Sequence, residues 1–169
     1  MRVLFAIAML FVFSFIDTTA AGFKLPENYF NMKPGDCKKY EKDIINAVEY
    51  LFKADPNKTE DIKKVNQFLL VWCAQSDDVF ISLFSGISEA MDGNAQCMIV
   101  FMAGCAKYAI ENKYPKDTVK VHAAGVKALI DVYQKATWIK KNDKLDEIVE
   151  IEKQGKLEQW VKEKLAEKK

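Results

Sequence analysis

Apolar residues recur at spacings of three and four along most of the chain, a pattern typical of amphipathic helices. The pattern predicts seven helices, at about residues 36–54, 57–75, 76–91, 94–113, 117–141, 143–154 and 156–167. No segment shows the sustained alternation of apolar and polar residues that a half-buried strand requires. The sequence therefore predicts an all-α fold, a compact bundle of about six or seven helices.

Residues at the helix ends support these boundaries. Asp36 and Asp117 are predicted N-caps, because a short acidic side chain accepts hydrogen bonds from free backbone N–H groups. Asp77 and Asp78 fit the first turn of a helix that Ser76 caps, next to its positive dipole end. Gly155 is a predicted C-cap between the last two helices.

The helix at 94–113 contains the most apolar stretch of the predicted helical region. From Cys97 to Ala106 it contains no charged or strongly polar residue. A helix that is apolar on every side is surrounded by protein or by lipid. A membrane span needs about 20 apolar residues, and Lys107 and Glu111 follow immediately after this stretch. We therefore expect this helix to lie at the centre of the bundle.

The N-terminus resembles a secretory leader. Arg2 is followed by an apolar run to Ile16 and then by small residues up to Ala21, the arrangement of a cleavable signal peptide. An uncut membrane anchor is the alternative, although the run is shorter than a span. We expect a signal peptide at 1–20, an irregular arm at 21–35 that docks on the body, and one helical domain at 36–169. The mature protein is then exported, to the periplasm or outside the cell.

Charge limits the classes of partner. The 169-residue chain has 25 basic and 24 acidic residues. A nucleic-acid-binding surface requires a clear basic excess, so no nucleic-acid partner is expected. In the tail after Lys140, lysine and glutamate are interspersed. This pattern is typical of a solvated helix face with ion pairs one turn apart.

The four cysteines allow several pairings in an oxidising compartment. Cys97 and Cys105 are about 12 Å apart along one helix, too far for a disulfide. An antiparallel pair of helices brings Cys37 near Cys73, so we predict that bridge, worth about 4 kcal/mol in the loop-entropy model. Two cross-links, Cys37–Cys105 with Cys73–Cys97 or the reverse, are the alternative. The spacings match no metal-binding motif, and no metal or other cofactor is expected.

Few residues suggest catalysis. His122 is the only histidine, and a triad requires a serine and a carboxylate beside it. Asp77 and Asp78 are adjacent in a predicted helix and diverge by about 100°, so they do not converge on one ion. No local sequence motif supports an enzyme. The serines that a triad with His122 would use are Ser82, Ser85 or Ser88.

Two further features concern binding and modification. Aromatic and methionine side chains of the third and fourth helices form a possible apolar pocket, although such residues at helical spacing more often form a core. Asn57, with Lys58 and Thr59, forms an N-glycosylation sequon that matters only in a eukaryotic secretory pathway. The pocket candidates are Trp72, Phe80, Phe84, Met98, Phe101 and Met102.

Three stretches resemble small exported all-helical proteins of Gram-negative bacteria, a group without an assigned activity. They are FLLVWCAQSDDVFISL, FMAGCAKYAIENKYPKD and GKLEQWVKEKL, and the resemblance covers most of the mature chain. It implies an α-fold and export, and it transfers no catalytic residue. The cysteines are not part of the resembling pattern.

Three functional hypotheses follow from these observations. The first is an exported non-enzymatic interaction or structural protein: an adaptor, an inhibitor or a chaperone-like factor with a protein partner. The second is a carrier of a small apolar ligand between helices, which requires an enclosed apolar cavity of about 300 Å³ or more. The third, an enzyme, requires His122 or the aspartate pair to face a cleft with partners.

Overall fold

The computed structural model describes residues 24–57, 61–91 and 94–167, and the leader predicted at 1–20 lies outside them. Within these ranges there are nine helical elements and no strand, which confirms the all-α prediction. The two 3-10 helices are η1 (Tyr29–Asn31) and η2 (Pro34–Tyr40). The seven α-helices are α1 (Glu41–Lys53), α2 (Asp61–Gln75), α3 (Ser85–Ala90), α4 (Ala95–Glu111), α5 (Thr118–Tyr133), α6 (Asp143–Lys153) and α7 (Leu157–Ala166).

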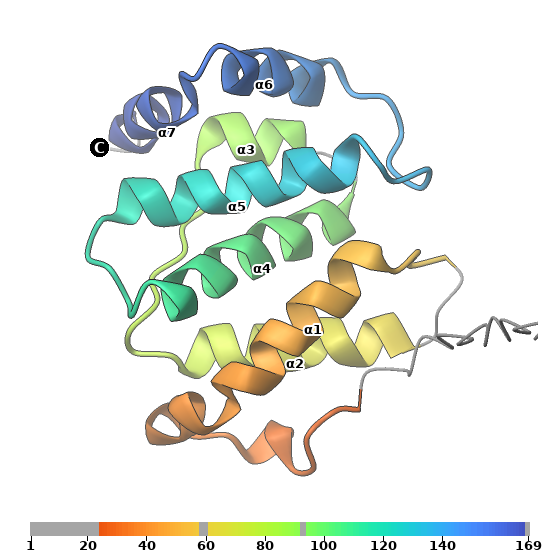
Figure 1. The fold of residues 1–169 in the computed structure, drawn as a ribbon, viewed down its shortest axis with the longest axis vertical. Coiled ribbons are helices and arrows are strands. Elements are labelled where there is room, and N and C mark those ends of the chain that lie inside the picture. Colours follow the sequence, from red (N-terminus) through yellow and green to blue (C-terminus); the bar gives the residue numbers. More distant parts are fainter. Residues whose placement is uncertain (1–23, 58–60, 92–93, 168–169) are drawn as a thin grey trace, which may run out of the picture.

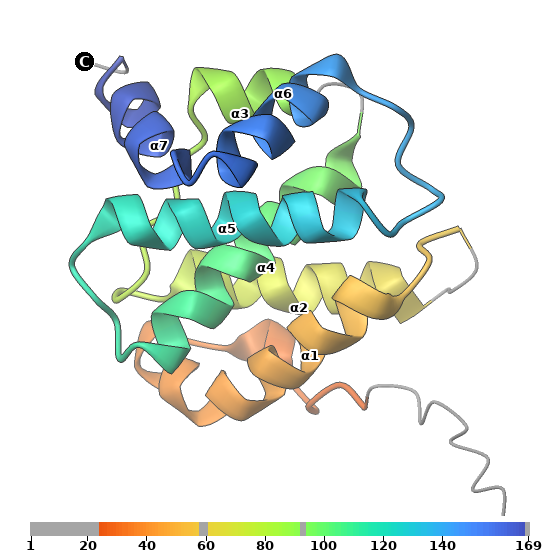
Figure 2. The same cartoon turned by 45° about the horizontal axis from the view of Figure 1, so that its top comes forward.

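The helices form three layers. α4 and α5 run antiparallel through the middle of the molecule, α1 and α2 pack on one side, and α3, α6 and α7 lie on the other (Figure 1). The same order is visible after rotation in Figure 2. None of the helices in the described ranges combines the length and apolar character needed to cross a membrane.

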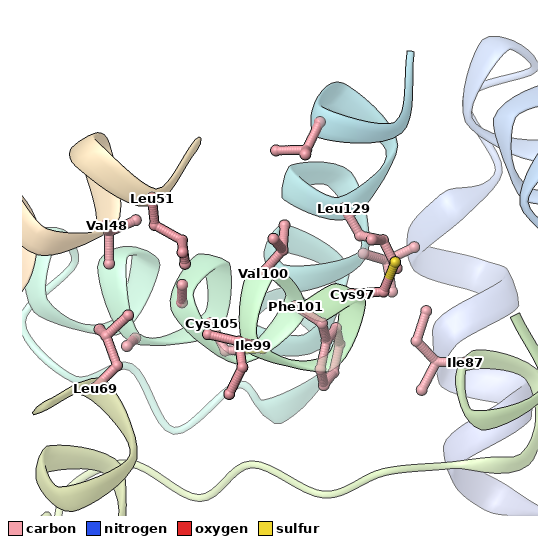
Figure 3. Packing of buried hydrophobic residues seen from close by; sticks show 14 of the residues in the cluster. Val48, Leu51, Leu69, Ile87, Cys97, Ile99, Val100, Phe101, Cys105 and Leu129 are labelled. Atoms are coloured by element: carbon pink, nitrogen blue, oxygen red, sulfur yellow. The ribbon is translucent and has the colours of Figure 1, made fainter. Parts of the chain in front are cut away.

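The central position predicted for the helix at 94–113 is confirmed by α4. Val48 and Leu51 of α1 approach α4 from one side, whereas Leu129 of α5 and Ile87 of α3 lie near its N-terminal half (Figure 3). Complete burial of such a side chain stabilises a fold by roughly 1.5–3 kcal/mol. α5 is as deeply buried as α4, which the sequence analysis did not predict. The buried residues of α4 are Cys97, Ile99, Val100, Phe101, Ala103, Gly104, Cys105, Ala106 and Ala109.

Two glycines set the close approach of α4 and α5. A Cβ atom on Gly104 would lie 2.5 Å from the Cβ of Ala128 and 3.0 Å from the Cα of Gly125. A Cβ atom on Gly125 would lie 2.7 Å from the carbonyl oxygen of Phe101 and would also overlap the Sγ of Cys105. The two backbones therefore touch at this crossing, and any side chain on either glycine would separate them.

The predicted helix at 76–91 is wrong over most of its length. Only α3 is helical there, and residues 76–84 form an irregular strap. The strap leads from the end of α2 across the molecule to α3 in the opposite layer (Figure 1). As a helix it would reach roughly 13 Å, whereas an extended chain reaches about 30 Å, so crossing the layers requires the extended form. Val79 and Phe84 hold the strap to the core.

The predicted helix at 117–141 ends early, at Tyr133, and residues 134–142 form a loop. Two contacts fix this end. The Tyr133 hydroxyl donates to Asp146 at 2.7 Å and accepts from the backbone N–H of Asn142 at 3.2 Å. Asn142 in turn caps α6 and donates its side-chain amide to the carbonyl of Ala90 at 3.0 Å. Continuing α5 to residue 141 would break all of these bonds.

The remaining boundaries agree with the sequence analysis except at Asp36. Its predicted N-cap role is wrong, because Asp36 lies inside η2, where its carboxylate accepts a hydrogen bond from the backbone N–H of Lys33 at 3.3 Å. In the described part of the predicted arm, Tyr29 and Met32 are buried, and the Tyr29 ring packs edge-on at 5.3 Å from Phe68 of α2. Docking of the arm is therefore confirmed for these residues. Gly155 has φ of +69° and separates α6 from α7, as predicted for a C-cap.

Candidate interaction site

His122, the predicted catalytic candidate, is enclosed in the core at 1% exposure. Its Nε2 accepts a hydrogen bond from the backbone N–H of Ser82 at 3.0 Å, so Nδ1 carries the proton and donates to the carbonyl of Thr118 at 2.6 Å. The Ser82 hydroxyl also lies 3.3 Å from Nε2. A triad requires a carboxylate at Nδ1, but here a main-chain carbonyl occupies that place. The rings of Phe84 and Phe101 each lie 6.1 Å from the imidazole, so His122 joins the strap to α5 inside the core.

The predicted capping role of Asp77 and Asp78 is wrong, because the helix begins only at Ser85. Both carboxylates are exposed on the strap, and Asp78 forms a surface ion pair with Lys38 at 3.8 Å. Across the described ranges, no three metal-binding side chains gather in one place.

The predicted Cys37–Cys73 disulfide is not formed, and all four cysteines are free thiols. The antiparallel arrangement does bring Cys37 to the end of α2, but its main neighbour there is Trp72. The Trp72 indole donates to the Cys37 carbonyl at 3.0 Å, and the Cys37 Sγ lies 4.0 Å from the Trp72 carbonyl oxygen. Cys97 and Cys105 both lie on the continuous helix α4, which excludes a bond between them.

Burial controls the chemistry of these thiols. It raises the pKa of Cys73 to about 12, with a smaller contribution from Cys37, and it raises the pKa of Cys97 to about 11. Burial also raises the pKa of Cys105 well above its usual value. Only the thiolate is nucleophilic, so these cysteines are inert near neutral pH.

We expect the folded protein to react with iodoacetamide at pH 8 on the order of a hundredfold more slowly than the urea-unfolded chain.

The folded pKa values are raised, so the neutral thiols stabilise the fold below the unfolded pKa of about 8.5. This stabilisation is lost as pH rises toward 11 to 12, through the folded values. Thermal unfolding at pH 8, 9.5 and 11 measures the loss. A melting temperature that did not fall over this range would contradict the burial of the thiols.

The six residues of the predicted apolar pocket do not share one environment. Trp72, Phe84 and Phe101 are fully buried, and Phe84 packs edge-on against Phe101 at 6.3 Å. Met98 and Met102 are partly buried against the core. Phe80 is 73% exposed on the strap and lines no interior space with the others.

Two sequence-based interpretations concern the surface. The lysine- and glutamate-rich tail forms ion pairs one turn apart, such as Lys153–Glu150 at 2.7 Å and Lys164–Glu167 at 2.8 Å, as expected for a solvated face. Asn57 is exposed after α1, whereas residues 58 and 59 of its sequon lie outside the described ranges.

The loop at 134–142 forms a site that the sequence analysis missed. Half-buried Trp138 lies between two open grooves. One, of about 440 Å³, separates the end of α1 from the end of α5. The other, of about 350 Å³, lies between the loop and the starts of α4 and α6. We call Trp138 and these two grooves the Trp138 site. In Figure 1 the loop projects from the right-hand edge, near the end of α1.

Lysines surround the Trp138 site. Lys53 and Lys135 line the first groove, and Lys140 and Lys141 line the second. Lys141 pairs with Asp146 at 3.7 Å, whereas the other three form no ion pair with any described residue. The floors are apolar, with contributions from Phe52, Val132, Ile139 and Leu145. The arrangement suits non-covalent binding. The Cys97 thiol also lines the second groove, but burial raises its pKa to about 11 and keeps it protonated near neutral pH.

The sequence contained two signals for this site. Asn142 and Asp143 form a good N-terminal cap for α6, so the preceding helix had to end somewhere before them. Thr137 and Ile139 are β-branched and weaken a helix slightly. Neither signal placed the end of α5 at Tyr133, because the bonds that fix it come from α6 and from the carbonyl of Ala90.

A third groove, of about 450 Å³, lies beside α5. Tyr108, Ala123, Ala124 and Leu157 line its apolar part, and a close Lys127–Glu152 ion pair stands at its edge. Like the Trp138 grooves it is open to solvent, so it is not the enclosed cavity that a carrier requires.

Comparison with protein-family models, with curated proteins and with solved structures found no match to this chain. The resemblance to small exported proteins of Gram-negative bacteria therefore stays a prediction.

Proposed function

We propose that this chain is an exported, non-enzymatic interaction protein that binds a protein partner through the Trp138 site. The observation that carries the proposal is the half-buried tryptophan between two open grooves with partly apolar linings, beside three lysines that have no ion-pair partner among the described residues. Tryptophan is among the residues most enriched at the centres of binding interfaces, where it fills pockets and excludes water. Binding without catalysis also accounts for the enclosed position of His122, which no substrate reaches in this structure.

Export is the second part of the proposal, and it rests on the N-terminal sequence alone. Arg2, the apolar run to Ile16 and the small residues before Gly22 have the composition of a cleavable leader. Three of the four free thiols are buried and Cys73 is partly buried, which protects them from oxidants as well as from alkylation. The thiols therefore place no constraint on the compartment.

Native mass spectrometry of the protein isolated from its own host tests both parts. We expect a mass lacking about the first 20 residues and a co-purifying protein that is lost from Trp138→Ala. Loss of one central aromatic anchor weakens binding by about 2 kcal/mol or more, roughly thirtyfold. Phe80→Ala is the matched control, because Phe80 is an exposed aromatic on the strap, away from the Trp138 site.

The outcomes separate the hypotheses. A partner that stays bound to Trp138→Ala refutes the proposed site, and an intact leader refutes export. A small molecule of a few hundred daltons that co-purifies in place of a protein favours the carrier hypothesis.

A further inference from the structure

We infer that the partner segment bound at the Trp138 site is an acidic peptide with large apolar side chains. This inference rests on the proposed function and adds the chemical class of the partner. Its first support is the make-up of the site, because Trp138 lines both grooves and each groove also has apolar residues in its lining, such as Val132 in the first and Leu145 in the second. A segment that crosses Trp138 can place one apolar side chain in each groove.

The second support is charge. Among the described residues, four lysines line the two grooves and Asp55 is the one acidic residue in their lining. One oxygen of Asp55 already accepts a hydrogen bond from the backbone N–H of Asn57 at 2.9 Å. Lys53, Lys135 and Lys140 are exposed and have no ion-pair partner in the described ranges, so a partner with carboxylates at the groove edges would complement them.

A nucleic acid fits this site less well. The chain as a whole has a formal net charge of +1, and nucleic-acid binding normally requires a marked basic excess. The grooves are short and apolar at their floors, where Phe52, Val132 and Leu145 contribute, and a sugar–phosphate backbone gains nothing from such surfaces. Nucleic acid is therefore an outcome that the experiment tests, and an acidic peptide is the inference.

Selection of 12-residue peptides from a random display library on the full-length protein tests the inference. We expect the selected peptides to be enriched in Asp and Glu around two large apolar residues. Fluorescence anisotropy then measures Kd for the best peptide and for a version in which Gln and Asn replace its acids. We expect the neutral version to bind at least tenfold more weakly, and the acidic peptide to lose affinity in about 0.5 M salt.

Charge reversal locates the binding. Lys135→Glu with Lys140→Glu should raise Kd at least tenfold, and Trp138→Ala should do the same. The matched control is Lys116→Glu with Lys162→Glu, which changes the net charge equally at two exposed lysines outside the Trp138 site. We expect this control to change Kd less than threefold.

Three results would overturn the inference. The first is a set of selected peptides without enrichment in Asp and Glu. The second is a control variant, Lys116→Glu with Lys162→Glu, that raises Kd as much as the lysine pair of the site does. The third is a single-stranded oligonucleotide that displaces the bound acidic peptide at a lower concentration than unlabelled peptide does. If neutral peptides bind and lose affinity in Trp138→Ala, the acidic partner is refuted but the proposed function is not. If the native partner binds Trp138→Ala as tightly as the wild type, the proposed function itself is refuted.

Discussion

Replacing Gly125 by alanine should destabilise the protein by about 2 kcal/mol, a large fraction of the 5–15 kcal/mol that holds a typical domain together. A Cβ atom at this position would meet the Sγ of Cys105, and it would lie 2.7 Å from the Phe101 carbonyl oxygen and 2.9 Å from its ring. The carbonyl belongs to α4 and cannot rotate away, so α4 and α5 must move apart. Overpacking a core costs typically 1–3 kcal/mol and occasionally more. The better helix propensity of alanine offsets about 1 kcal/mol of this strain.

Urea unfolding followed by circular dichroism at 222 nm measures this effect. Gly35→Ala is the control, because a Cβ atom there meets nothing within 4 Å, and we expect it to change stability by less than about 1 kcal/mol. Combining Gly125→Ala with Cys105→Ala removes the sulfur contact but leaves the Phe101 carbonyl, so it should restore only part of the lost stability. A Gly125→Ala protein as stable as the wild type would mean that α4 and α5 do not touch at this crossing.

Replacing His122 by alanine should cost about 3 kcal/mol or more. The change opens a cavity between Phe84 and Phe101 and leaves the Ser82 N–H and the Thr118 carbonyl without their imidazole partner. The strap is then released from α5 at one of its main attachments. We expect faster amide hydrogen exchange at Ser82 and its neighbours in addition to the lower unfolding free energy.

Two variants separate a structural histidine from a catalytic one. Ser82→Ala removes the hydroxyl but keeps the backbone N–H that donates to Nε2, so we expect a change of only about 0.5 kcal/mol. His122→Phe leaves no cavity, because phenylalanine is somewhat larger than histidine, but it loses both hydrogen bonds. It should be intermediate in stability between the wild type and His122→Ala. If Ser82→Ala destabilised the fold as much as His122→Ala, the hydroxyl rather than the main chain would be the important partner of the imidazole.

Local regularities explain which predictions from the sequence were correct. The apolar stripe of α1, the apolar composition of α4, and the Asp117 and Gly155 caps depend on neighbours in the chain, so a single sequence was sufficient to place them. The helix predicted over the strap was wrong for the opposite reason, because its conformation depends on distant parts of the chain. Residues 76–84 have helical spacing of apolar side chains, but α2 and α3 lie in different layers, and the chain between them has to extend.

The candidate sites divide in the same way. The sequence predicted that Cys37 and Cys73 lie close together. The ends of the chain segments that contain them do meet, but the Trp72 indole, not the Cys73 thiol, bonds to Cys37. Trp138 fell inside the helix predicted at 117–141. The hydrogen bonds of Tyr133 and Asn142 end that helix early and place the tryptophan between two grooves. No regularity along the chain encodes a contact such as the one between Asn142 and Ala90, which lie 52 positions apart in the sequence.

By itself the sequence determined the helical class, most helix boundaries and the central place of α4, because periodicity and capping are properties of short stretches. Only the tertiary structure decided the close glycine crossing of α4 and α5, the extended strap held by His122, the free thiols and the Trp138 site. Each of these depends on which side chains come into contact across the layers. Those contacts are decided when the whole chain packs to the density of an organic crystal.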